Sequence, residues 1–163
     1  MPRSSIRSFA RMLACSPALP AVLLGKGPNN PSKLLPGEML NHHEFLVAPS
    51  RSGVVAYVNQ EHGWFEIYIK SEYRRRWETP TDSTQALANL RASGRGVELF
   101  LAMSTDGALR LYWKNLGPGN NFPMVVWTNP GPHVPGSFLI LDDNANLVIR
   151  DPSDNERILW MAP

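Results

Sequence analysis

The sequence predicts an all-β protein in which three antiparallel sheets surround a pseudo-threefold axis. Frequent Pro and Gly residues, 15 and 12 in a chain of 163, favour many short strands over long helices. In addition, three nine-residue segments align without gaps, and each follows an apolar stretch and precedes a tryptophan. A single unit of this kind cannot bury its own apolar face, so we expect the three units to close on one another.

The three aligned segments are QEHGWFEIY (60–68), STDGALRLY (104–112) and DDNANLVIR (142–150). Alternate residues of a strand share one face of a sheet. The second, fourth, sixth and eighth positions are polar, small, apolar and apolar in every segment. This order is typical of a turn that leads into a strand whose apolar side chains enter a core.

Each unit also supplies one tryptophan after its aligned segment. The three are Trp77, Trp127 and Trp160. We expect these core residues to be mostly buried and to lie near one another around the axis. The repeats then occupy about 34–80, 97–130 and 136–163, within one domain of residues 34–163.

Residues 1–33 form a basic leader without an acidic residue. One interpretation is a mitochondrial import segment, because Arg3, Arg7 and Arg11 would share one side of a helix. A second is a secretory signal formed by MLACSPALPAVLLG, although this stretch contains two prolines and is too short to span a membrane. A third is a disordered tail. All three predict a leader that packs poorly against the domain.

The formal net charge of +2 hides an uneven distribution. All 14 acidic residues lie after residue 37, whereas only 11 of the 16 Lys and Arg residues do. The domain is therefore slightly acidic. This pattern argues against a nucleic-acid partner. The only basic run, Arg74 to Arg76, is interpreted as a solvated loop or strand edge. Cys15 is the single cysteine, which excludes an internal disulfide and a thiolate metal site.

Catalytic and metal-binding chemistry is sparse. His42, His43 and Glu44 carry metal-ligand groups, but adjacent strand residues point to opposite faces, so a satisfied or solvated pair of histidines is preferred over a metal site. The sequence has no Gly-rich phosphate loop after a strand, no nucleophile elbow and no pair of catalytic carboxylates that can be placed. We therefore expect no enzymatic activity, no metal and no cofactor.

The aligned segments resemble the motif Gln-X-Asp-X-Asn-X-Val-X-Tyr of the bulb-type, monocot mannose-binding lectins. The stretch LLPGEMLNHHEFLVAPSRSG, which begins at Leu34, is also similar to the start of that family's domain. The resemblance covers about residues 34–163 and implies the β-prism II fold and mannose-type glycans as partners. It also implies a homodimer that exchanges C-terminal strands, although here the chain stops three residues after Trp160.

In that motif the amides and the carboxylate form a row of donors and acceptors for mannose hydroxyls. The Val contacts ring carbons, and the Tyr hydroxyl closes the far end. Each hydroxyl contact contributes only about 0.5–1.5 kcal/mol, so the loss of two or three contacts severely weakens a site. No segment here keeps more than two of the five positions. The first segment retains Gln60 and Tyr68, the second retains Asp106 and Tyr112, and the third retains Asn146 and Val148.

The third segment is the best candidate for residual sugar binding, because Asp142 and Asn144 still extend the row of polar groups. The alternative is that these residues are turn formers ahead of a strand. In the first segment, His62 and Trp64 are candidates for stacking on a sugar ring, although packing under a loop or an exposed aromatic patch is the preferred interpretation.

The second segment is expected to have lost mannose binding. Its outward face comprises Ser104, Asp106, Ala108, Arg110 and Tyr112, and Leu109 and Leu111 point inward. Ala108 lacks the amide of the motif, and Arg110 replaces a short apolar side chain. Since same-face residues four apart in a strand lie about 13 Å apart, no direct contact between Arg110 and Asp106 is expected.

Two functions are consistent with this pattern. The first is a carbohydrate-binding lectin for mannose-type glycans with weakened or partly lost sites. The alternative is an interaction or assembly module that keeps the scaffold without binding sugar. The regular core and the scattered binding positions leave both open.

Overall fold

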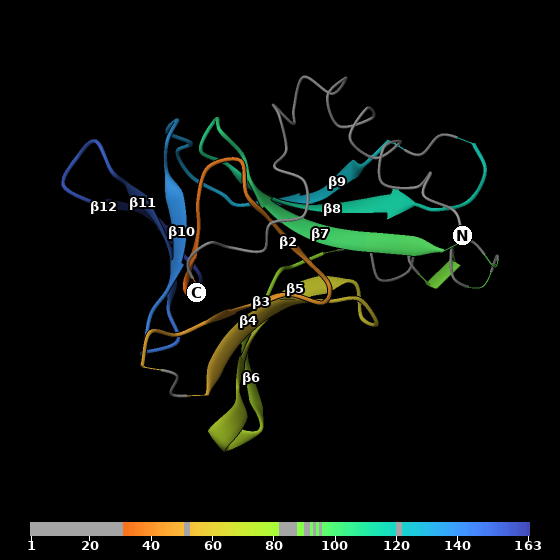
Figure 1. The fold of residues 1–163 in the computed structure, drawn as a ribbon, viewed down its shortest axis with the longest axis horizontal. Coiled ribbons are helices and arrows are strands. Elements are labelled where there is room, and N and C mark those ends of the chain that lie inside the picture. The colour runs from red at the N-terminus through yellow and green to blue at the C-terminus, as the bar shows by residue number, and fades with distance from the viewer. Residues whose placement is uncertain are drawn as a thin grey trace, which may run out of the picture.

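The computed structural model describes residues 31–50, 53–81, 88–89, 92, 94, 96–119 and 122–163. These residues form three antiparallel four-stranded sheets, which confirms the predicted all-β architecture (Figure 1). The first sheet has the order β3 (Phe45–Val47), β4 (Val54–Asn59), β5 (Trp64–Ile69), β6 (Arg74–Glu78). A 3₁₀ turn, η1 (Lys70–Glu72), joins β5 to β6.

The other two sheets repeat this arrangement. The second sheet has the order β2 (Met39–Asn41), β7 (Val97–Met103), β8 (Leu109–Asn115), β9 (Met124–Thr128). The third has the order β1 (Lys33–Leu34), β10 (Phe138–Leu141), β11 (Leu147–Asp151), β12 (Arg157–Met161). The short strands β1, β2 and β3 follow one another in sequence, yet each joins a different sheet, so this segment ties the sheets together.

The core lies where the inner faces of the three sheets meet. Leu34, Leu40 and Leu46, one from each short strand, are fully buried in a single cluster with residues of all three sheets. At one place in this core the indole rings of Trp77, Trp127 and Trp160 meet, with centroid separations of 5.7 to 6.0 Å and edge-to-face angles. Trp127 is buried, and the other two are half-buried and packed against the cluster. Such tilted contacts are the favoured geometry for aromatic pairs.

The same backbone geometry recurs in each sheet. The residue two positions after each tryptophan donates its amide to the strand of the aligned segment, at 2.9 to 3.0 Å. These pairs are Thr79 N to Phe65 O, Asn129 N to Leu109 O and Ala162 N to Leu147 O. In each sheet a β-bulge also shifts the register at the last two positions of the aligned segment.

The small residue of each aligned segment sits in a left-handed backbone conformation. Gly63, Gly107 and Ala145 have φ of 88°, 89° and 62°. At Gly107 a Cβ atom would lie 2.1 Å from the carbonyl oxygen of Val134, which no side chain can occupy. The turn and this close approach therefore account for the glycine.

The start of the described chain differs from the expected leader. Pro31, Ser32 and Lys33 were expected to pack poorly, but the Pro31 carbonyl accepts from Val47 N at 2.6 Å and the Ser32 carbonyl accepts from Leu141 N at 2.9 Å. Lys33 pairs with Ile140 in the third sheet. The rest of the leader lies outside the described residues. No helix of the described segments is long and apolar enough to cross a membrane.

These contacts give a prediction about truncation. We expect a chain that starts at residue 34 to have a lower free energy of unfolding than a chain that starts at residue 31, by about 1–3 kcal/mol. The physical reason is the loss of the strand pairing of Lys33 and of the two backbone hydrogen bonds that Pro31 and Ser32 accept, each contributing about 1 kcal/mol. Urea denaturation of the two truncated chains measures the difference, and equal midpoints would show that residues 31–33 contribute no stability.

Candidate functional site

The outer face of the second sheet is buried to an extent that the sequence analysis did not expect. Leu109 and Leu111 enter the core as predicted, but Ser104, Ala108 and Tyr112 are also buried, and Tyr112 is only 1% exposed. The Tyr112 ring stacks on Phe100, with centroids 5.1 Å apart. Tyr112 belongs to a cluster separate from that of Leu109 and Leu111, so the two faces of the strand are as predicted, but the outer face is buried at these three residues instead of open to solvent. The nearly continuous apolar run VELFLAM (97–103) is the sequence signal of a strand buried on both faces.

Arg110 and Asp106 form a bidentate ion pair, contrary to the sequence expectation. Two guanidinium nitrogens donate to the two carboxylate oxygens at 3.0 and 2.7 Å. The expectation failed because it applied strand spacing to a turn: Gly107 N bonds Ser104 O, and the strand begins only at Leu109. Partial burial acts to raise the pKa of Asp106, but hydrogen bonds from Arg110 and the Ala108 amide outweigh it and hold that pKa below its ordinary value.

The second segment thus presents no open row of polar groups. The hydroxyls of Ser104 and Tyr112 are buried, and neither makes a well-formed hydrogen bond to a residue that the structure describes. Burial raises the pKa of the Tyr112 hydroxyl, which stays neutral. Both carboxylate oxygens of Asp106 accept hydrogen bonds from Arg110. A sugar would have to displace this pair to reach Tyr112.

In the third segment the polar side chains stabilise their own turn. Asp142 accepts through Oδ1 from the backbone amides of Asn144 and Asn146 at 2.9 and 2.8 Å, and through Oδ2 from the Asn146 side-chain amide at 2.9 Å. Val148 is buried, and Arg150 donates to the Glu156 carbonyl at 2.9 Å. This geometry is the turn chemistry that the sequence left as the alternative. Of the four candidate residues of this segment, Asp142, Asn144, Asn146 and Val148, only Asn144 is well exposed.

In the first segment Gln60 has a structural role. Its side-chain oxygen accepts from Leu99 N at 2.9 Å, and its side-chain nitrogen donates to the Val97 carbonyl. Both ends of this amide are therefore bound to the backbone of β7. Gln60 connects the first sheet to the second, a contact that no pattern in the sequence indicates.

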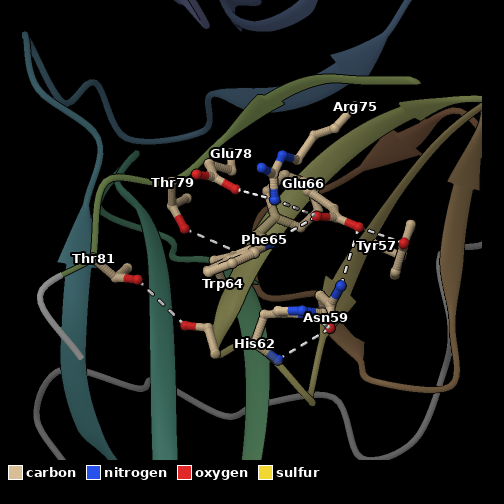
Figure 2. A network of polar contacts seen from close by, with 11 residues as sticks. Tyr57, Asn59, His62, Trp64, Phe65, Glu66, Arg75, Glu78, Thr79 and Thr81 are labelled. Carbon is tan, nitrogen blue, oxygen red and sulfur yellow. Dashed lines mark hydrogen bonds and ion pairs between the residues drawn. The ribbon is translucent and has the colours of Figure 1, made fainter. Parts of the chain in front are cut away.

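Glu66, at the position where the motif has Val, is the centre of a buried polar network (Figure 2). Its carboxylate accepts hydrogen bonds from the Tyr57 hydroxyl, from Asn59 Nδ2 at 3.2 Å and from Trp64 Nε1 at 2.6 Å. Arg75 lies 3.7 Å from the same carboxylate. Burial, and then the hydrogen bond to Glu66 and its negative charge, raise the pKa of Tyr57 to about 12.

Trp64 is held as a rigid part of this network. His62 stacks on it at a centroid distance of 4.7 Å, and the Arg75 guanidinium lies 5.0 Å from its ring centroid. Figure 2 shows the indole between these two groups. His62 Nδ1 is in turn 3.1 Å from Asn59 Oδ1. His62 is exposed and Trp64 is half-buried, so the two rings form a partly exposed aromatic patch that contacts within the protein hold in place.

Beside this network a cleft of about 300 Å³ opens on the outer face of the first sheet. Its lining residues are His42, His43, Glu44, Phe45, Val55, Tyr57, Tyr68 and Lys70. Tyr68, the last residue of the first aligned segment, is half-buried and lies in this cleft. A retained motif residue therefore lines an open cleft.

The loop from β2 to β3 forms one wall of the cleft. Glu44 Oε2 accepts from the backbone and side-chain amides of Asn41 at 2.8 and 3.0 Å, which fixes the loop. The rings of His42 and His43 lie 3.7 Å apart, because both residues belong to a turn; the expectation of opposite strand faces was wrong. Burial, and then His43, lower the pKa of His42. Among the described residues no group of three metal-ligating side chains is close enough to hold a metal ion.

The fold of this chain is similar to that of solved lectin structures. No protein-family model matches the sequence, and no curated protein matches it. Among solved structures, the monomeric monocot mannose-binding lectins from Gastrodia elata match with a TM-score of 0.56 and 18% identity, over 80% of this chain and 96% of theirs. The mannose-specific agglutinin from snowdrop (Galanthus nivalis) bulbs, complexed with methyl-α-D-mannoside, matches with a TM-score of 0.51 and 25% identity, over 74% of this chain and 89% of its own.

These matches confirm the fold that the sequence resemblance implied. The three antiparallel sheets form the β-prism II architecture of the monocot mannose-binding lectins. The protein is lectin-like in structure.

Proposed function

We propose that the protein is a carbohydrate-binding lectin whose sugar site is the cleft on the outer face of the first sheet, with mannose-type glycans as the first candidates. The observation that carries the proposal is the position of Tyr68 in an open cleft with both aromatic and polar walls. Sugar-sized pockets combine a few fixed polar groups with apolar contact surface. The fold shared with mannose-binding lectins supports the same conclusion.

The polar groups of the cleft are well placed for neutral hydroxyls. Glu66 fixes the Tyr57 hydroxyl, and Asn41 fixes the Glu44 carboxylate, so these groups are oriented before a ligand binds. Val55 and Tyr68 are cross-strand neighbours and provide apolar surface for ring carbons. Lys70 adds an ammonium donor at the rim. Preorganised groups of this kind lower the entropic cost of binding.

The proposal predicts a specific effect of one hydroxyl. We expect Tyr68→Phe to weaken the binding of methyl α-mannoside about 2- to 10-fold, because it removes one hydrogen bond and keeps the ring. Tyr73→Phe is the matched control, since Tyr73 is exposed on the turn after η1 and does not line the cleft. Isothermal titration calorimetry with mannosides and a panel of other neutral methyl glycosides measures both. Equal weakening by the two changes, or no heat of binding at millimolar glycoside, would count against the cleft as the site.

A second candidate function is a protein interaction module. One reason is that the second aligned segment has no open row of polar groups for a sugar. Another is a set of exposed apolar residues on β9 and in the loop between β8 and β9. These are Leu116, Phe122, Met124 and Val125. β12 pairs with β11 of its own sheet, so a homodimer through these exposed residues would need no exchanged C-terminal strand. Light scattering at several concentrations tests the dimer, and a monomer that binds no sugar would require another partner.

A further inference from the structure

A second hollow, of about 420 Å³, adjoins the proposed sugar cleft on the outer face of the first sheet. Its lining residues are Pro31, Phe45, Val47, Ala48, Pro49, Gly53, Val55 and Lys70. Phe45, Val55 and Lys70 also line the sugar cleft. The two hollows therefore adjoin at these three residues.

The walls of the second hollow differ chemically from those of the cleft. Apart from Lys70, every lining side chain is apolar or absent. Two of its backbone amides are also occupied, because Val47 N donates to Pro31 O and Ala48 N donates to Val54 O. A polyol placed here would lose hydrogen bonds to water and find few replacements. An alkyl or aryl group would instead be removed from water against apolar walls.

Phe45 marks the boundary between the two hollows. Its side chain is 54% exposed, although it belongs to a sheet whose neighbouring residues are well packed. The Lys70 ammonium lies 5.9 Å from its ring centroid, so the junction has one apolar and one cationic surface. A ligand that crosses this junction would cover the exposed ring.

We propose that the preferred ligand is a glycoside with an apolar aglycone, whose sugar occupies the cleft and whose alkyl or aryl group occupies the second hollow. This inference rests on the proposed sugar-binding function of the cleft. Sugar and aglycone are joined by one glycosidic bond, and the two hollows share Phe45, Val55 and Lys70 at their junction. The proposed occupant of the apolar hollow is therefore the alkyl or aryl group of the glycoside.

The test compares three probes in calorimetric titrations of the full chain: methyl α-mannoside, hexyl α-mannoside and hexanol. The expected result is that the hexyl glycoside binds about tenfold or more tightly than the methyl glycoside, because several methylene groups leave water. Hexanol alone is expected to bind much more weakly than the hexyl glycoside. If the methyl and hexyl glycosides bind equally, the aglycone site is wrong and the sugar site stands. If neither glycoside binds, both proposals are wrong, and if hexanol binds as tightly as the hexyl glycoside, the hollow is a site for apolar molecules in general and this inference is overturned.

Two variants test whether the hexyl group binds in the second hollow. Val47→Thr keeps the volume of the side chain and adds a hydroxyl, and Pro49→Ser changes an exposed loop residue of the same hollow. Each should reduce the hexyl-over-methyl ratio severalfold and leave the affinity for the methyl glycoside unchanged. Val125→Thr, on the exposed edge of the second sheet, is the matched control and should leave the ratio intact. An unchanged ratio in both Val47→Thr and Pro49→Ser would place the hexyl group elsewhere.

Discussion

Trp127→Ala is expected to lower the free energy of unfolding by about 3–5 kcal/mol, the range for removing a large aromatic side chain from a core. Trp127 is the most buried of the three axial tryptophans, and its ring contacts both Trp77 and Trp160. A small domain has about 5–15 kcal/mol of stability in total, so this one change consumes a large part of it. Guanidinium denaturation followed by far-UV circular dichroism measures the loss.

Trp127→Phe is the control for this prediction. It retains an aromatic ring at the same place and is expected to cost clearly less than the alanine variant, because part of the edge-to-face contact survives. A loss below about 1 kcal/mol for Trp127→Ala would mean that the three tryptophans do not hold the sheets together. The comparison therefore separates the role of the axial cluster from that of the remaining core.

Glu66→Ala is expected to have an effect of similar size, about 3–5 kcal/mol, for a different reason. The change removes three hydrogen bonds, from the half-buried Tyr57 hydroxyl, Asn59 amide and Trp64 indole to one buried carboxylate, and each contributes about 1 kcal/mol or more. Glu72→Ala is the matched control: Glu72 pairs with Arg74 at 2.8 Å on the surface and should cost at most about 1 kcal/mol. Equal losses in the two variants would show that the network adds nothing beyond a surface ion pair.

The same network predicts how stability depends on alkaline pH. In the unfolded chain Tyr57 loses its proton near pH 10, whereas in the folded protein its pKa is raised to about 12. Between these values the unfolded state binds fewer protons, so the free energy of unfolding falls as the pH rises. We expect Glu66→Gln to lower the pKa of Tyr57 and to flatten this decline, which absorbance titration at 295 nm and denaturation at several pH values can follow. A Tyr57 pKa in Glu66→Gln that is unchanged from that of the unaltered protein would attribute the shift to burial alone.

The fold was predictable because its determinants repeat in the sequence. Each unit has one tryptophan, one small residue before its strand and alternating apolar positions, so the same geometry is imposed three times. The left-handed turns at Gly63, Gly107 and Ala145 supply the physical reason for the small position. Even so, the sequence placed Pro31, Ser32 and Lys33 in the leader, because a two-residue strand such as β1 is too short to produce a pattern.

The candidate site was less predictable because it depends on contacts between distant segments and on turns. Alternation along a strand does not show that Gln60 binds the backbone of β7. Strand spacing placed Arg110 too far from Asp106, whereas the turn brings them together. The substitution of Glu66 for an apolar motif residue was visible in the sequence, but its partners Tyr57 and Arg75 come from the neighbouring strands.

The position of a bound sugar decides whether the cleft of the first sheet is the binding site. Crystals grown with a saturating concentration of methyl α-mannoside should show the sugar in the cleft of the first sheet, in contact with Tyr57 and Tyr68 and facing Glu44. Asp106 and Arg110 should remain paired, with no sugar against the second sheet. A mannoside bound instead at Asn144 and Asn146 of the third sheet, or crystals of the folded protein without sugar at saturation, would contradict the account.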